Sequence, residues 1–121
     1  MWMMEWRALS ARIAAIFDSA KFLDLRTRDS TYWDGNRKAA GIAIFENAKS
    51  TVESLQRFRD VNEALLSVQP RTCLDRLLAA WKEPNGPHTK PVEYGLLPAL
   101  TLLASFRAEY SGPQISDQAI S

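Results

Sequence analysis

The spacing of apolar residues constrains the fold more than any other feature, because they recur three and four positions apart over long stretches. This spacing gathers them on one face of an α-helix, whereas a half-buried strand would need alternation. Residues 5–25 and 37–66 carry the longest such faces. The first face contains Trp6, Leu9, Ile13, Ile16, Phe17, Ala20 and Leu23. The second contains Phe45, Ala48, Val52, Leu55, Leu65 and Leu66, with Val61 slightly to one side of it. Alternating runs are absent and β-branched residues are scattered, so the sequence predicts an all-α fold.

Two shorter helices are expected over residues 71–82 and 91–110. In the helix 71–82, the side chains expected to face the core are Cys73, Leu74, Leu77, Leu78 and Trp81. In the helix 91–110, they are Leu96, Leu97, Leu100, Leu103, Phe106 and Tyr110. A loop rich in proline separates them, and residues 26–36 connect the two long helices. Gly95 and Pro98 predict either an irregular start to the last helix or a delay of regular helix until about residue 98.

A chain of 121 residues is the size of one domain. We expect an elongated bundle of four, alternatively five, helices over residues 1–110, followed by a flexible C-terminal tail, 111–121. The segment 37–66 would be about 45 Å long as one helix, against a diameter of about 35 Å for a compact globule of this length. Either the helix breaks near Arg59 and Asp60, or the molecule is elongated.

Residue types that support metal binding or nucleophilic catalysis are scarce. The chain has one His and one Cys, so no paired metal-ligand spacing occurs and no metal or other cofactor is expected. Only a contact between Cys73 and His88 would suggest an enzyme, and Cys73 falls on an apolar helix face where an inert thiol is usual. We therefore expect no catalytic residues. A single cysteine favours a reducing cytoplasm, and the apolar stretch 94–106 is too short to span a membrane.

Basic residues near the first connection are candidates for nucleic-acid contact. Arg26, Arg28, Arg37 and Lys38 are interleaved with aromatic residues, a combination that can grip phosphates and stack on bases. Nearby aspartates weaken this field, so a solvated connection with local ion pairs is the alternative. A formal net charge of +1 argues against a freestanding, nonspecific binder. Arg59 shares a face with apolar residues, and it either pairs with an aspartate inside the bundle or faces RNA or another subunit.

Large aromatic residues suggest protein contacts at two places. Trp2 and Trp6 stand with two methionines at the N-terminus, a set too wide for one helix face to bury. Tyr32 and Trp33 lie in the polar connection 26–36, where they either meet a partner or fold back onto the core.

The overall pattern resembles the small helical subunits of multi-subunit CRISPR effector complexes. The similar features are the size, the two long helices, the basic residues Arg26, Arg28, Arg37 and Lys38, and the leucine-rich last helix GLLPALTLLASF. The resemblance implies a noncatalytic subunit that packs beside copies of itself and larger subunits and contacts the backbone of a guide RNA or a target DNA strand. The near-zero net charge departs from this pattern.

A protein-only helical adaptor or dimeric regulator is the rival interpretation. It would bind a partner helix through Trp2, Trp6 and neighbouring apolar residues. Salt distinguishes the two, because phosphate contacts weaken steeply as salt rises and apolar contacts do not.

Overall fold

The computed structural model describes residues 2–21, 23 and 35–109. In order along the chain, the elements are α1 (Trp2–Ala20), α2 (Gly35–Val61), a short 3₁₀ turn η1 (Glu63–Leu65), α3 (Val68–Lys82), a second 3₁₀ turn η2 (Pro87–Thr89) and α4 (Val92–Glu109). Strands are absent from the described ranges, so the predicted all-α class is confirmed, with four α-helices there. Part of the first connection, which carries Arg26, Arg28, Tyr32 and Trp33, and the predicted tail lie outside these ranges.

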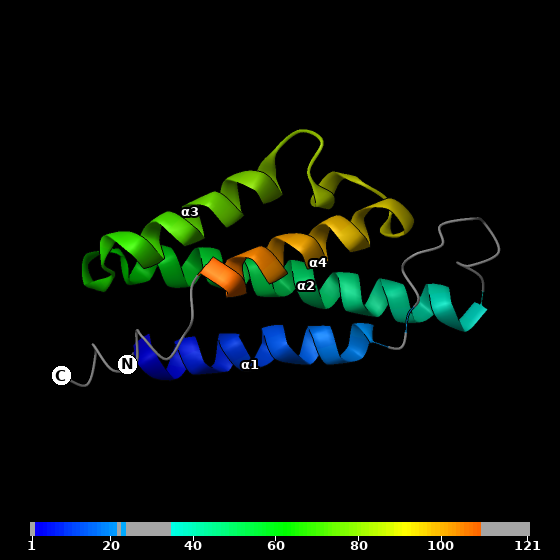
Figure 1. Ribbon diagram of the computed structural model, residues 1–121, viewed down its shortest axis with the longest axis horizontal. Coiled ribbons are helices and arrows are strands. Elements are labelled where there is room, and N and C mark those ends of the chain that lie inside the picture. The colour runs from blue at the N-terminus through cyan, green and yellow to red at the C-terminus, as the bar shows by residue number, and fades with distance from the viewer. Residues whose placement is uncertain (1, 22, 24–34, 110–121) are drawn as a thin grey trace.

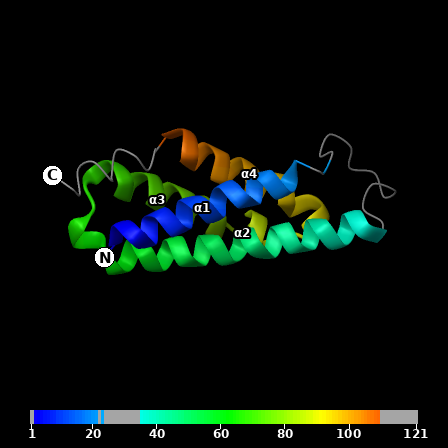
Figure 2. The same ribbon diagram turned by 90° about the horizontal axis from the view of Figure 1, so that it is seen from below.

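The helices form an elongated bundle (Figure 1). α1 and α3 lie on opposite sides of the pair formed by α2 and α4, and α2 and α4 run in the same direction (Figures 1 and 2). Trp6 of α1 packs against Phe58 of α2 and Phe106 of α4, with ring centroids 5.7 and 5.9 Å apart. At the other end, the rings of Phe45 and Trp81 stack at 6.2 Å and join α2 to α3. The core therefore runs along the whole bundle.

Side chains from all four helices build this core. Phe58, Ile13, Ile16, Leu55, Leu74, Leu96 and Leu103 are the largest that are fully buried. The apolar faces predicted for the first, third and fourth helices supply much of this set. Phe58 and Ile44 are buried members of α2 that the predicted second face did not include.

α2 ends at Val61, earlier than residue 66 where the apolar pattern ends. The next residue, Asn62, is buried, and both its backbone N–H and its side-chain amide donate to the carbonyl of Phe58, at 3.0 and 2.9 Å. The chain then turns through η1 into α3. Val61 and Leu65 lie in solvent, 71% and 65% exposed, so the prediction that they face inward is wrong. Val61 lies beside the buried face of α2, and Leu65 follows the end of the helix.

α4 begins at Val92 and includes both Gly95 and Pro98, so its start is not delayed to residue 98. Gly95 allows a close approach, since a Cβ there would lie 2.8 Å from the carbonyl oxygen of Pro87 and 3.1 Å from a ring carbon of Phe45. Pro98 lies in the second turn, where its missing N–H leaves the Tyr94 carbonyl without a helical donor. α4 continues past it to Glu109, and its regular start lets η2 pack against it.

Candidate interaction surfaces

Arg59 is held by carboxylates of its own chain. Its Nε donates to Asp75 Oδ1 at 2.8 Å, and its Nη1 lies 3.4 Å from Glu63 and 3.7 Å from Asp60. The hydrogen bond to Asp75 is the largest of the effects that raise the pKa of Arg59. Three neighbouring carboxylates offset the guanidinium charge, so Arg59 forms the predicted Arg–Asp pair, with Asp75 53% exposed at the surface of the bundle. The same carboxylates would repel a phosphate, so they do not favour the predicted contact of Arg59 with nucleic acid.

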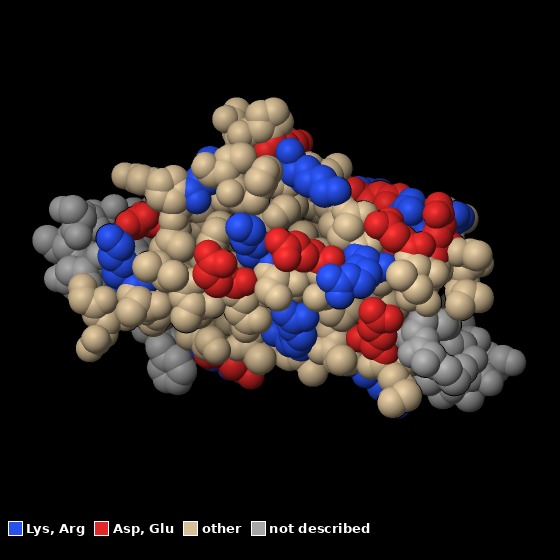
Figure 3. All heavy atoms as spheres, turned by 180° about the vertical axis from the view of Figure 1, so that it is seen from behind, with Lys and Arg blue, Asp and Glu red and all other residues tan. Residues whose placement is uncertain are grey.

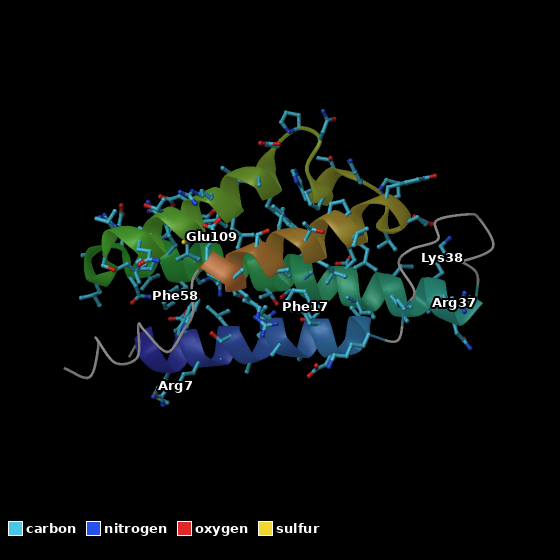
Figure 4. All side chains as sticks on the ribbon, viewed as in Figure 1. Arg7, Phe17, Arg37, Lys38, Phe58 and Glu109 are labelled. Carbon is cyan, nitrogen blue, oxygen red and sulfur yellow. The ribbon has the colours of Figure 1, made fainter. Side chains whose placement is uncertain are left out.

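Arg37 and Lys38 lie exposed in the first turn of α2 (Figure 4). Lys38 Nζ lies 3.9 Å from Glu93 Oε1 at the start of α4, and its side chain is still 55% exposed. Two of the five basic residues proposed for nucleic-acid contact are therefore accessible together. Apart from Arg59, the remaining candidates are Arg26 and Arg28, which lie outside the described residues, as do Tyr32 and Trp33.

Charges of both signs are mixed on the face opposite to that of Figure 1. Lys and Arg alternate there with Asp and Glu along the length of the molecule (Figure 3). Among the ion pairs of the bundle, Arg59 Nε lies 2.8 Å from Asp75 Oδ1. This face presents no extended field of one sign, which is what a phosphate backbone would need for strong attraction.

Trp6 belongs to the core, and its predicted place at a protein interface is therefore wrong. Its side chain is 3% exposed and packs between Phe58 and Phe106. The large apolar side chains at the N-terminus do not all lie on one buried helix face, as predicted: Trp6 points inward, and Met4 is 73% exposed. Trp2 is the first residue of α1, and the structure describes only its backbone.

Four large apolar side chains gather instead at one end of the bundle. Met4, Val61, Leu65 and Val68 are each between 65% and 73% exposed. They come from the first turn of α1, the last turn of α2, η1 and the first turn of α3, and Figure 1 shows these segments at the same end. We call these four residues the end surface. Fully burying a side chain of this kind is favourable by about 1.5–3 kcal/mol, so these exposed side chains are a candidate site for contact with another molecule.

The Cys73–His88 pair that would suggest an enzyme is not assembled. Cys73 faces Glu109, with its Sγ 3.7 Å from a carboxylate oxygen that also accepts from Arg76 at 2.8 Å. Burial, and next the charge of Glu109, raise the pKa of the Cys73 thiol, which disfavours the nucleophilic thiolate. The imidazole of His88 contacts the carbonyl of Trp81, two helical turns further along α3. The two side chains thus have separate partners.

Metal-binding clusters and membrane-spanning helices are absent from the described part of the structure. Within residues 2–21, 23 and 35–109, no three His, Cys, Asp or Glu side chains are grouped so as to hold a metal ion. No helix in those ranges has the length and apolar character required to cross a membrane. In comparisons with known proteins, the chain matches no family model, no curated protein and no solved structure.

Proposed function

We propose that this protein is a helical adaptor subunit that binds another protein chain through the end surface. The observation that carries the proposal is the exposure of Met4, Val61, Leu65 and Val68 at one end of the bundle. Three of the four stand within eight consecutive positions, from Val61 to Val68, around η1. Burying all four side chains would contribute about 1.5 kcal/mol or more for each of them.

Charged residues surround the end surface. Glu5, Arg7 and Arg57 are exposed near it on α1 and α2, and the side chains of Asp60 and Glu63 are 55% and 53% exposed. An apolar centre with a polar rim of mixed sign is the usual anatomy of a protein–protein interface. A phosphate backbone would be repelled by the two carboxylates, so the surrounding charges favour a protein partner.

A second candidate function rests on the opposite end of α2. Arg37 and Lys38 are exposed there in neighbouring positions, and they fit contact with an RNA or single-stranded DNA backbone. On this interpretation the chain is the noncatalytic small subunit of a multi-subunit ribonucleoprotein of the CRISPR effector type, in contact with larger subunits in the cytoplasm. The interpretation depends on the basic pair, whereas the adaptor depends on the end surface.

Affinity purification of the tagged full chain separates the two functions. The variant Val61→Ser/Leu65→Ser/Val68→Ser removes most of the end surface at exposed positions, and Ile42→Ser is a matched control near the other end of α2, where the side chain is 43% exposed. For the adaptor we expect a protein partner that survives nuclease and high salt, is lost with the triple variant and is kept with Ile42→Ser.

The ribonucleoprotein predicts the opposite pattern. Co-purifying nucleic acid and proteins would be released by nuclease or high salt, because phosphate contacts depend steeply on salt. They would be lost with Arg37→Glu/Lys38→Glu and kept with the triple variant. That pattern would contradict the adaptor proposal.

A further inference from the structure

α4 lacks the polar outer face that a surface helix normally has. No charged residue stands between Glu93 and Arg107. The inner face is buried and contains Gly95, Leu96, Ala99, Leu100, Leu103 and Phe106. The outer face carries Tyr94, Leu97, Thr101, Ala104 and Ala108, all exposed. A helix that is apolar on every side is normally covered on every side.

The one hydroxyl in the middle of this outer face is already satisfied. Thr101 Oγ1 donates to the carbonyl of Leu97 at 2.8 Å, within the helix. Tyr94 and Leu97 are 59% and 36% exposed, so large apolar surface remains uncovered at the start of α4. In Figure 1 α4 lies in front of α2, and in the view from below the last turns of α4 and the helix α2 lie on opposite sides of the molecule (Figure 2). The outer face of α4 is therefore accessible to another molecule.

We propose that this face is the contact between two copies of the chain, with the two α4 helices antiparallel about a two-fold axis near Thr101. Side-chain size along the face supports this arrangement. Tyr94 stands seven positions before Thr101 and Ala108 stands seven after it, while Leu97 and Ser105 stand four before and four after. A two-fold axis at Thr101 therefore sets each large side chain against a small one on the second copy.

The charges at the two ends of the face are also complementary in this arrangement. Glu93 and Arg107 are fourteen positions apart, close to four helical turns, so they lie on the same flank of α4. Antiparallel pairing brings each Glu93 beside Arg107 of the second copy, whereas parallel pairing would set like charges together. Within one copy Glu93 lies 3.9 Å from Lys38, and Arg107 lies over the ring of Phe17 at 5.1 Å. Both can reach across the contact without losing a strong bond.

The oligomeric state of the full chain tests this proposal. In sedimentation equilibrium over a wide range of concentrations we expect a monomer–dimer equilibrium for the natural sequence. Ala104→Glu/Ala108→Glu places charges on exposed positions of the face and should raise the dissociation constant by about tenfold or more. Ala15→Glu, at an exposed alanine of α1, and the triple variant of the end surface are controls that should dimerise like the natural sequence. Circular dichroism shows whether each variant keeps its helices.

The orientation has its own test. Glu93→Arg and Arg107→Glu should each weaken the dimer, and the two changes combined in one chain should restore it. Thr101→Cys in a Cys73→Ser background should form a disulfide between copies under oxidation, because only residues near the axis meet their own symmetry mates. A natural sequence that stays monomeric at every concentration would overturn the proposal. So would a dimer that tolerates Ala104→Glu/Ala108→Glu, or one that dissociates with Ala15→Glu or with the end-surface variant.

Discussion

Asp75 Oδ1 accepts a hydrogen bond of 2.8 Å from Arg59 Nε, and this contact joins the end of α2 to the first half of α3. Asp60 and Glu63 stand on the other side of the same guanidinium. The cluster is exposed on its carboxylate side, so salt screens it and each pair contributes little alone. The cluster links the end of α2 to α3 and to the residues that follow α2.

The coupling between Arg59 and Asp75 is measurable. We expect Arg59→Gln and Asp75→Asn each to lower the midpoint of thermal unfolding, and the double variant to lower it by less than the sum, because both remove the same contact. High salt should shrink these differences. Arg57→Gln, at an exposed arginine two positions away, is the control and should have little effect. Strictly additive effects of the two changes would show that the pair does not contribute.

Phe58 and Val61 are three positions apart on α2 and have opposite environments. Phe58 is fully buried against Trp6, whereas Val61 is 71% exposed. Phe58→Ala should lower the free energy of unfolding by about 3–5 kcal/mol, and Val61→Ala should change it by no more than about 0.5 kcal/mol. Urea titration followed by circular dichroism measures both. Similar losses for the two variants would contradict the placement of the end of α2.

Whether Gly95→Ala raises or lowers the free energy of unfolding depends on how closely Gly95 is packed. In an open helix, Ala in place of Gly stabilises by about 0.5–1 kcal/mol. Here the added Cβ would meet the carbonyl oxygen of Pro87 at 2.8 Å and the ring of Phe45 at 3.1 Å. We therefore expect a loss of about 1–3 kcal/mol, since backbone and ring must move apart. Denaturant unfolding decides between the two, and a gain in stability would show that η2 does not pack on α4 as described.

Cys73 should be slow to react in the folded protein. Burial and the charge of Glu109 raise its pKa above the ordinary value of 9.0, so the thiolate forms only at higher pH. Alkylation should begin at higher pH than in the unfolded chain, and Glu109→Gln should move that onset down because it removes the second of these causes. Mass spectrometry of the alkylated protein follows the rate, with Cys73→Ser as the blank.

The same shift has a consequence for stability. A pKa that is higher in the folded state means that folding favours the protonated thiol, so this contribution is complete below the ordinary pKa and is lost as pH rises through the folded value. The natural sequence should therefore lose stability above about pH 9 more steeply than Cys73→Ser does. Equal slopes would indicate that the thiol is open to water.

Periodicity predicted four helices and most of the core because the apolar faces of α1, α3 and α4 are regular over several turns. It failed at the end of α2, where the apolar pattern continues through Leu65 and Leu66 but the helix ends at Val61. One turn of irregular backbone rotates every later side chain, which is why Leu66 is buried and Leu65 is exposed. Phe58 was not predicted to be buried because the predicted apolar face of this helix included Val61 in its place.

The candidate surfaces were harder to predict than the fold. The partner of Arg59 lies sixteen positions away on another helix, so its pairing depends on how α2 and α3 pack. Trp6 was ambiguous because it fits both an apolar helix face and an exposed aromatic cluster, and only the contact with Phe58 and Phe106 decides between them. The apolar outer face of α4 was visible as an uncharged stretch, but its exposure follows from the position of α4 in the bundle.

The cluster formed by Trp6, Phe58 and Phe106 also bears on how the chain folds as it is synthesised. Trp6 leaves the ribosome before both of its aromatic neighbours, and Phe106 follows it about one hundred residues later. Until then α1 can pair with α2, but its face toward α4 stays open to water. A nascent chain in that state exposes apolar surface and is prone to aggregate. The addition of α4 thus completes the core of the bundle, and chaperone binding should be stronger on chains arrested before α4 emerges than on chains arrested after it.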